Sequence, residues 1–211
     1  MSIICFEGAS AVGKTTTSNA LKEVSGAFVV PEVNQLFKRP ENEPVEWYFE
    51  RQAERWQLAE KESKNYRLVI LDGDPFQPLW YNWAYDFVGW QKLDFMERFY
   101  RTMINNKMIA FPHLYFIFGA REAELRKRRA CDAARQRRHF EIHLKMIEPM
   151  RRYFEAMQNF SPGQVLFLDA ESIQSNIDFI EKRAPDVGAR QRSESEFLLS
   201  KMIEWLRENK A

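Results

Sequence analysis

The sequence is poor in cysteine, since its 211 residues include only Cys5 and Cys131. Two cysteines so far apart do not form the disulfide framework on which small secreted domains depend. Cys5 also lies in a short apolar run that we predict to be a buried strand. We therefore expect a protein of a reducing compartment, with the cytoplasm as the default location.

Long apolar runs are absent as well. No stretch approaches the ~18 residues that a membrane-spanning helix requires, and residues 3–6 are too short, and lack the basic lead, for a signal peptide. The formal net charge is only +1, which gives the chain no overall attraction to nucleic acid or to a membrane. A composition of 45% hydrophobic and 29% charged residues indicates a globular fold rather than disorder.

Glycine is scarce too, with eight residues, but two of them are spaced as in a phosphate-binding loop. Residues 8–15 follow the pattern Gly-x4-Gly-Lys-Thr, with an apolar run before them and a helical pattern after them. Glycine lets backbone N–H groups turn toward a polyphosphate, and a helix N-terminus adds partial positive charge. The sequence therefore predicts a nucleoside triphosphate site formed by Gly8, Ala9, Ser10, Ala11, Val12, Gly13, Lys14, Thr15 and Thr16.

Apolar runs and helical patterns alternate along the chain. The apolar runs are residues 3–6, 28–30, 68–71, 114–118 and 165–168. The helical patterns cover residues 45–62, 78–87, 91–108, 121–131, 137–158, 172–183 and 194–208. Short apolar strands separated by helices predict a five-stranded parallel sheet with helices on both faces, in a three-layer α/β fold. Ligands of such sheets bind at the carboxyl ends of the strands, so we sought functional residues there.

Two residues are candidates for holding Mg²⁺. The hydroxyl group of Thr15 is placed to bind the ion beside the phosphates, which Lys14 would reach. Asp72 ends the third apolar run, where its carboxylate would lie beside the phosphate-binding loop. The alternative is an aspartate that only forms a turn before Gly73. We favour the metal role because the phosphate-binding loop is already present, and Asp74 is a second acid for the substrate region.

The residues after the second strand supply candidates for the acceptor side. Glu32 either accepts a proton from a substrate hydroxyl or is a solvated loop carboxylate. On the helix that follows, Arg51, Gln52 and Arg55 either reach the same cleft or form an exposed face. The sequence alone does not decide between the two roles of Glu32, nor between the two placements of the three helix residues.

Residues 121–138 contain eight arginines and lysines but only three acids. One interpretation is a lid whose arginines neutralise the charge of phosphates during transfer, with Arg128, Arg129 and Arg135 as the candidates. The alternatives are a salt-bridged solvent face and a nucleic-acid-binding patch. The net charge of +1 and the interleaved acids argue against nucleic acid.

Aromatic residues gather between positions 76 and 100, where there are ten of them. A pocket that stacks a flat ring would use Phe76, Trp80 or Tyr81, because these are nearest to Asp72. The alternatives are the interface of a homodimer and ordinary core packing.

Several of these segments, in this order, resemble the thymidylate kinase and deoxynucleoside kinase group. Residues 6–8 with residues 13–16 resemble the opening of thymidylate kinases, and residues 30–33 are similar to the segment that carries a base-like glutamate in deoxynucleoside kinases. Residues 51–55 stand where those kinases contact the acceptor nucleoside. Residues 125–141 resemble their lid, and residues 165–170 resemble the last strand and the loop beside adenine, which gives Asp169 a place in the ATP site.

The resemblance implies a P-loop NTPase fold of the nucleotide kinase type over residues 1–183, with the Arg-rich lid at 121–138. Residues 184–211 are expected to be a linker and a helix packed on the same domain. Two positions depart from the family: Gly73 follows Asp72 where these kinases carry an arginine, and Ala11 replaces a glycine. The missing arginine leaves the acceptor undefined.

We therefore predict an ATP- and Mg²⁺-dependent kinase of a small molecule, most simply a nucleoside or nucleotide. Its expected catalytic residues are Lys14, Glu32, Asp72, Arg128 and Arg135. One alternative is phosphoryl transfer to another hydroxyl compound, such as an antibiotic or a sugar. An alternative of another class is a non-catalytic nucleotide- or nucleic-acid-binding protein.

Overall fold

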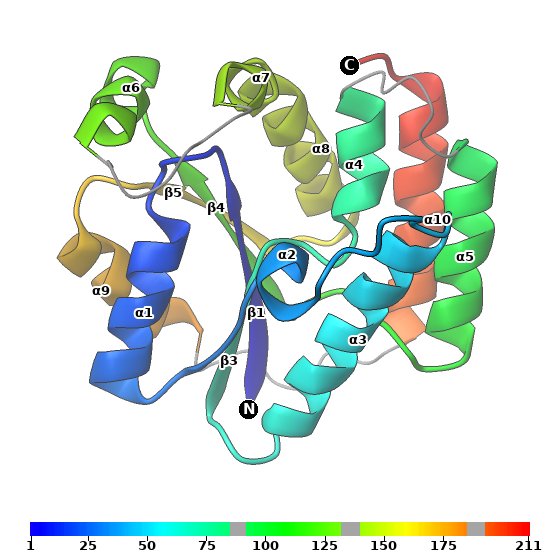
Figure 1. Cartoon of the computed structure of the whole chain (residues 1–211), viewed down its shortest axis with the longest axis horizontal. Helices are drawn as coiled ribbons and strands as arrows, with labels where there is room; N and C mark the ends of the chain where they lie inside the picture. The colour runs from blue at the N-terminus through cyan, green and yellow to red at the C-terminus, as the bar shows by residue number, and fades with distance from the viewer. Residues whose placement is uncertain (85–91, 132–139, 185–192) are drawn as a thin grey trace.

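A computed structural model describes residues 1–84, 92–131, 140–184 and 193–211 of the chain. Within these residues one parallel sheet has the strand order β2-β3-β1-β4-β5 (Figure 1). The strands are β1 (Ser2–Gly8), β2 (Phe28–Val30), β3 (Leu68–Asp72), β4 (Leu114–Gly119) and β5 (Val165–Asp169). The predicted five-stranded parallel sheet is confirmed. Because β1 lies between β3 and β4, the chain reverses its direction of travel across the sheet at the carboxyl end of β1, where such folds bind ligands.

Helices connect the strands and follow the predicted pattern with two differences. They are α1 (Lys14–Ser25), α2 (Val33–Leu36), α3 (Trp47–Glu62), α4 (Gln77–Ala84), α5 (Leu93–Asn105), α6 (Glu122–Cys131), α7 (Phe140–Lys145), α8 (Ile147–Phe160), α9 (Ile173–Arg183) and α10 (Ser193–Glu208). The short helix α2 was not predicted, since four residues are too few to show a helical period. The single helix expected over 137–158 is two helices in its described part, separated at Met146.

The two faces of the sheet are covered by separate hydrophobic cores. Successive residues of each strand point to opposite faces, so that Ile3 and Cys5 enter one core while Ile4 and Phe6 enter the other. The larger core contains side chains of α3, α4, α5, α8 and α10, and the smaller one those of α1, α6 and α9. Figure 1 shows these two groups of helices on opposite sides of the sheet. Both faces are therefore closed, and the sheet's carboxyl edge is left for a ligand.

The C-terminal helix belongs to the larger core. Buried apolar residues of α10, including Leu199 and Met202, pack in it, and the helix contacts α5 and α8. Arg207 adds ion pairs to Asp94 and Glu97 of α5. Within the described ranges, no helix is both long enough and apolar enough to cross a membrane.

Candidate functional site

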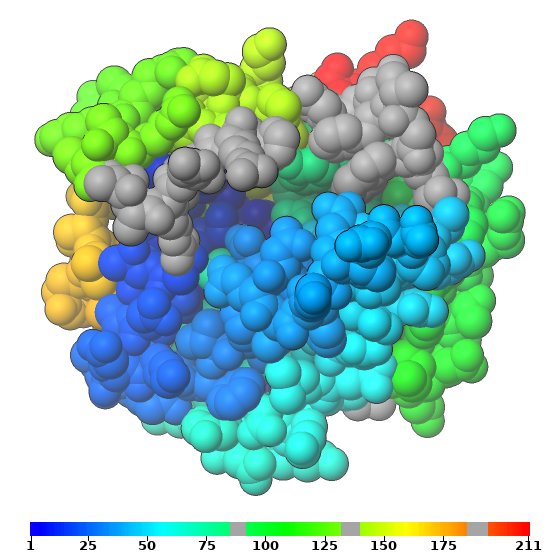
Figure 2. Space-filling view, viewed as in Figure 1, coloured from blue at the N-terminus to red at the C-terminus, as the bar shows by residue number. Residues whose placement is uncertain are grey.

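One cleft of about 1270 Å³ lies at the carboxyl end of the sheet. Its walls come from the loop after β1, the segment around α2, the start of α3, α4, α6, α7 with α8, and the loop after β5. Figure 2 shows the surface hollowed between α1 and α2, in blue, and α6 and α7, in green and yellow-green. All nine residues predicted to hold a triphosphate, residues 8–16, line this cleft.

The loop after β1 has the backbone shape that its sequence pattern predicts. Gly8 has φ +147°, and a Cβ there would lie 2.6 Å from the carbonyl oxygen of Phe118, so only glycine fits. Gly13, with φ +109°, is the N-cap residue of α1. Lys14 Nζ donates a hydrogen bond of 2.8 Å back to the carbonyl oxygen of Gly8, which closes the loop. Ala11 holds φ 69° without being glycine, a conformation that an L side chain rarely adopts.

Thr15 and Asp72 meet where α1 begins and β3 ends. Thr15 Oγ1 donates a hydrogen bond of 2.9 Å to Asp72 Oδ2, while the buried Asp72 Oδ1 has no partner in the described part of the chain. The hydroxyl oxygen keeps lone pairs for a cation, and the unpaired carboxylate oxygen lacks a positive partner. Across the described ranges there is no cluster of three or more His, Cys, Asp or Glu that could hold a metal ion. The pair therefore suits Mg²⁺, which takes few protein ligands and many from phosphates and water.

Glu7 is a buried acid that the sequence interpretation did not single out. Only 3% of its surface is exposed, and its two carboxylate oxygens accept hydrogen bonds from the backbone N–H groups of Gly8 and Asp74. Burial raises the pKa of this carboxyl group above its ordinary value, although Lys14 acts in the opposite direction. Glu7 thus ties the phosphate-binding loop to the segment after β3. Its place directly before Gly8 was the signal that could have identified it.

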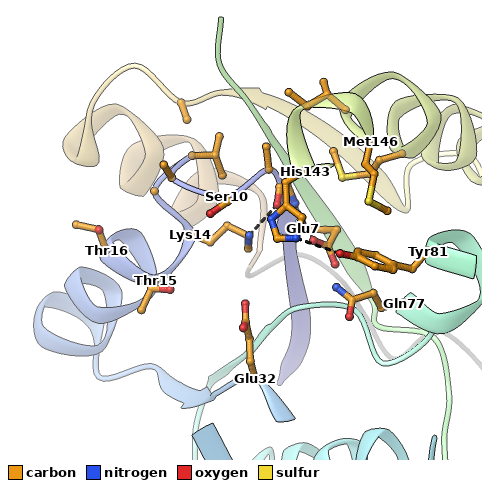
Figure 3. Close-up of a pocket in the computed structure, with 18 of the residues that line it drawn as sticks. Glu7, Ser10, Lys14, Thr15, Thr16, Glu32, Gln77, Tyr81, His143 and Met146 are labelled. Atoms are coloured by element: carbon orange, nitrogen blue, oxygen red, sulfur yellow. Dashed lines mark hydrogen bonds between the residues drawn. The ribbon is translucent and has the colours of Figure 1, made fainter. Parts of the chain in front are cut away.

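Glu32 faces the cleft from the opposite side of the phosphate-binding loop. It precedes α2, is exposed, and lines the cleft. Figure 3 shows its side chain and that of Lys14 directed toward the same space from opposite sides. Of the two sequence interpretations of Glu32, this placement favours a residue that can reach a ligand.

Arg51, Gln52 and Arg55 were predicted to bind substrate, but the structure places all three away from the cleft. Arg55 is 1% exposed and donates hydrogen bonds to the carbonyl oxygens of Pro31 (2.8 Å) and Asp72 (2.7 Å). Gln52 is equally buried and accepts from Arg55. Arg51 pairs with Glu54 and covers the rings of Phe37 and Trp47. Arg55 therefore positions the ends of β2 and β3 rather than a ligand.

The backbone directly after Asp72 has a conformation that favours glycine. Gly73 has φ +96°, which L side chains rarely adopt, so a side chain at this position would strain the backbone. A Cβ there would make ordinary contacts, 3.8 Å from Glu32 and 4.0 Å from Arg55. The backbone conformation, rather than a lack of space, therefore accounts for glycine at position 73.

Two further substrate candidates are core residues. Phe76 is fully buried and stacks on Phe111 with ring centroids 3.8 Å apart. Asp74 is also fully buried, and its Oδ1 accepts hydrogen bonds from the Tyr115 hydroxyl and the Phe76 N–H. Burial raises the pKa of Asp74 from 3.8 to about 7. Neither residue lines the cleft, and the aromatic surplus here is mainly core packing.

Trp80 and Tyr81, in contrast, do line the cleft. Tyr81 Oη lies 3.0 Å from His143 Nε2 of α7, and Figure 3 shows this contact bridging the cleft wall. His143 was missed because a lone histidine in a helical pattern carries no signal by itself. Tyr48, Gln77 and Met146 were missed as well, and they line the same side.

The arginines of the predicted lid have different environments. Arg128 lines the cleft and joins two of its walls, donating to the carbonyl oxygens of Val12 (2.9 Å) and Ala170 (2.7 Å). Arg129 pairs with Glu141 and covers the Phe140 ring, which fits the salt-bridged alternative. Arg135 lies outside the described residues.

Asp169 was predicted to lie in the ATP site, but it is an exposed residue at the end of β5 and does not line the cleft. Residues 170–173, which follow it directly, form that wall instead.

Comparisons with known proteins agree with this architecture. A family model described as an AAA domain matches residues 3–103. A structure of deoxyadenosine kinase from M. mycoides with bound dATP is 18% identical, with a TM-score of 0.57 over 86% of this chain and 98% of that chain. Thymidylate kinase from Candida albicans is 15% identical, with a TM-score of 0.54 over 86% of this chain and 91% of that chain. No curated protein sequence matches the chain significantly. The chain thus has the predicted three-layer fold of P-loop nucleoside and nucleotide kinases.

Proposed function

We propose that this protein is an ATP-dependent kinase that transfers a phosphoryl group to a hydroxyl group of a small neutral molecule, a nucleoside in the first instance. The observation that carries the proposal is a cleft that joins a complete phosphate-binding loop to an exposed carboxylate, that of Glu32, and to aromatic walls. A protein that only switches between nucleotide-bound states needs the phosphate-binding loop, but it needs neither the Glu32 carboxylate nor the aromatic walls. The similarity in fold to deoxyadenosine kinase and thymidylate kinase supports the same class of reaction.

The donor half of the cleft would hold the triphosphate of ATP. Backbone N–H groups of residues 8–16 and the N-terminus of α1 would surround the phosphates. Lys14 would exchange its hydrogen bond with the Gly8 carbonyl for one with a phosphate oxygen. Arg128 holds the two flanking walls together at Val12 and Ala170, and from there its charge would act on the phosphates. Thr15 and Asp72 would hold Mg²⁺, which neutralises phosphate charge when it is bound.

The charge of the acceptor half favours a neutral acceptor. Among the cleft-lining residues in the described ranges, three are cationic (Lys14, Arg39 and Arg128) and five carry carboxylates. Lys14 and Arg128 belong to the donor half, and Arg39 is paired with Glu43. The phosphate of an acceptor nucleotide would therefore lie near the carboxylates of Glu7 and Glu32. Among the described cleft-lining residues of the acceptor half, no unpaired cationic side chain would balance its charge. This argues for a nucleoside rather than a nucleotide.

The reaction follows from this placement. The acceptor oxygen attacks the γ-phosphorus, a new P–O bond forms, and the bond between the γ-phosphorus and the β–γ bridging oxygen breaks to release ADP. The proton of the acceptor hydroxyl passes to the Glu32 carboxylate. Glu7 is unsuited to this role because both of its oxygens accept backbone hydrogen bonds and its side chain is buried. Glu32, which is exposed to the cleft, is the base.

An acceptor outside the nucleoside class is the second candidate function. The segment that resembles the nucleoside-contacting part of these kinases, residues 51–55, does not reach the cleft. The acceptor site is therefore built from other residues, and a non-nucleoside alcohol such as an antibiotic or a sugar would fit the same donor half.

A transfer assay with γ-labelled ATP tests both candidates. We expect a labelled product from at least one member of a panel of nucleosides, nucleotides, sugars and aminoglycosides. Lys14→Ala should lower the rate by about 10²–10³ because it removes a charge that acts in the transition state, and Glu32→Gln should do the same without weakening ATP binding. Lys22→Ala, an exposed change on the last turn of α1, is the matched control. A folded protein that labels nothing in the panel would refute the proposal.

A further inference from the structure

The turn that follows α10 is hydrogen bonded to α4, a helix that carries part of the acceptor wall. The indole Nε1–H of Trp83 on α4 donates a hydrogen bond of 2.8 Å to the backbone carbonyl oxygen of Asn209. An indole N–H can only donate and a carbonyl oxygen can only accept, so the direction of this bond is fixed. Figure 1 shows the last residues of the chain, in red, beside α4. Neither Trp83 nor Asn209 lines the cleft.

Asn209 is itself held on the last turn of α10. Its backbone N–H and its side-chain Nδ2 both donate to the carbonyl oxygen of Trp205, over 3.0 Å and 2.9 Å respectively. These bonds satisfy a carbonyl group of the kind that a helix end leaves without a partner. They also fix the residue whose own carbonyl oxygen receives Trp83. The acceptor for the Trp83 indole is therefore held in place by the Asn209 side chain.

Aromatic contacts extend this connection to α8. The rings of Trp83 and Trp205 are in contact, with their centroids 4.9 Å apart. From α8, the Arg152 guanidinium carbon lies 5.4 Å from the centroid of the Trp83 ring, and Tyr153 contacts Trp205 edge-on. The set of Trp83, Arg152, Trp205 and Asn209, called the bracket below, thus joins three helices, α4, α8 and α10.

The bracket is close in the chain to two walls of the acceptor half. On α4, Trp80 and Tyr81 line the cleft three and two residues before Trp83. On α8, Met150 lines the cleft two residues before Arg152. Backbone hydrogen bonds join successive turns of a helix, so a shift of either helix at the bracket also moves its cleft-lining side chains. The bracket therefore controls the separation of the two walls.

We infer that Trp83 and Asn209 are positioning residues for the acceptor, because they hold α4 against α8 at the separation that the acceptor half of the cleft requires. The inference rests on the proposed function and gives the C-terminal helix a part in it. The donor half is tied through other contacts, those of Arg128 and the bond from Thr15 to Asp72. Loosening the bracket should therefore weaken acceptor binding and leave ATP binding unchanged.

Two conservative substitutions loosen the bracket. Trp83→Phe keeps an aromatic ring and removes the indole donor. Asn209→Ala keeps the carbonyl oxygen and removes one of the two bonds that hold it. Glu208→Ala, an exposed change at the neighbouring position, is the matched control.

Steady-state kinetics with ATP and each of deoxyadenosine, deoxyguanosine, deoxycytidine and thymidine measure the effect. In both bracket variants, the KM for the nucleosides that the wild type phosphorylates should rise about three- to tenfold, the effect of losing one hydrogen bond, while kcat and the KM for ATP stay within about twofold. A general loss of stability would instead lower kcat through the folded fraction and leave both KM values alone. An unchanged nucleoside KM in both variants, or equal increases for nucleoside and ATP, would overturn the inference.

Hydrogen–deuterium exchange separates this inference from the function on which it rests. Without substrates, the backbone amides of α4 should exchange faster in Trp83→Phe and Asn209→Ala than in the wild type and in Glu208→Ala, while those of α1 should not change. Faster exchange in α4 of a protein that phosphorylates no nucleoside would refute the nucleoside kinase and retain the hold of the bracket on α4. Phosphoryl transfer with unchanged exchange in α4 would retain the kinase and refute the bracket.

Discussion

Thr15 Oγ1 lies 2.9 Å from Asp72 Oδ2, and this hydrogen bond joins the first turn of α1 to the carboxyl end of β3. The two residues are 57 positions apart in the chain. They meet because β1 and β3 are neighbours in the sheet and pair in parallel, with Phe6 opposite Asp72. This hydrogen bond therefore holds the start of α1, directly after the phosphate-binding loop, next to the carboxylate that we propose to bind Mg²⁺.

Thr15→Val keeps nearly the same side-chain shape, and it should lower both the transfer activity and the free energy of unfolding. It removes the hydroxyl ligand for Mg²⁺ and leaves the buried Asp72 carboxylate without this donor, at a cost of about 1–3 kcal/mol in the free energy of unfolding. Transfer activity should need a higher Mg²⁺ concentration, measured by titrating the ion at saturating ATP. Thr15→Ser keeps the hydroxyl and should restore both properties. An unchanged Mg²⁺ dependence in Thr15→Val would exclude Thr15 as a ligand.

Arg55→Met should destabilise the protein much more than Arg51→Met does. Arg55 is buried and hydrogen bonds to Pro31, Asp72 and Gly73, so its loss leaves several buried carbonyl oxygens unpaired and should cost about 3–5 kcal/mol. Arg51, four residues earlier on α3, makes a partly exposed ion pair with Glu54, whose loss should cost about 1 kcal/mol or less. Urea denaturation measures both. Equal losses would contradict a positioning role for Arg55.

Asp74 should make the stability depend on pH in the direction opposite to that of a salt-bridged acid. Burial raises its pKa from 3.8 to about 7, so between these values the folded state holds a proton that the unfolded chain has lost. The contribution of Asp74 to stability should therefore be greatest near pH 4, fall as the pH rises toward 7, and stay low above that.

The comparison with Asp74→Asn isolates this effect, because other groups titrate equally in both proteins. The difference in unfolding free energy between wild type and variant should shift in favour of the variant as the pH rises from 4.5 to 8. A difference that does not change over this range would show that Asp74 has an ordinary pKa.

Arg128→Ala should weaken ATP binding, whereas Arg126→Ala should not. Arg128 joins Val12 to Ala170 across the donor half of the cleft. Arg126, half a turn earlier on α6, pairs with Glu122 and Glu141 at the surface. We expect the KM for ATP to rise about tenfold or more in Arg128→Ala, as for the loss of a charge-assisted hydrogen bond of ~1.5–3 kcal/mol. Similar KM values in both variants would make Arg128 a structural residue only.

Local patterns in the sequence predicted the fold and the donor half of the site. Continuous apolar strands separated by amphipathic helices allow few arrangements other than a covered parallel sheet. The loop at residues 8–16 needs only its own glycines and the helix that follows it, so its shape is encoded in consecutive residues. Glu32 and Asp72 were found because each ends a recognisable strand.

The acceptor half could not be predicted in this way. Its walls come from α3, α4, α7 and α8, and an amphipathic helix does not reveal which of its polar side chains faces a cleft and which an interior bond. Arg55 and Gln52 looked like ligand-binding residues, yet they satisfy one another and the carbonyl groups at the strand ends. Phe76 looked like a ring-binding residue, yet it stacks on Phe111 in the core.

The sequence by itself thus determined the shape of the loop that we propose as the triphosphate site, because this loop is one continuous segment whose backbone geometry its glycines impose. Only the tertiary structure decided which side chains face this loop across the cleft. The hydrogen bond between Tyr48 and Gln77, two residues that line the cleft, joins residues 29 positions apart on different helices. Such a bond depends on how the helices pack, and no local pattern in the chain encodes it.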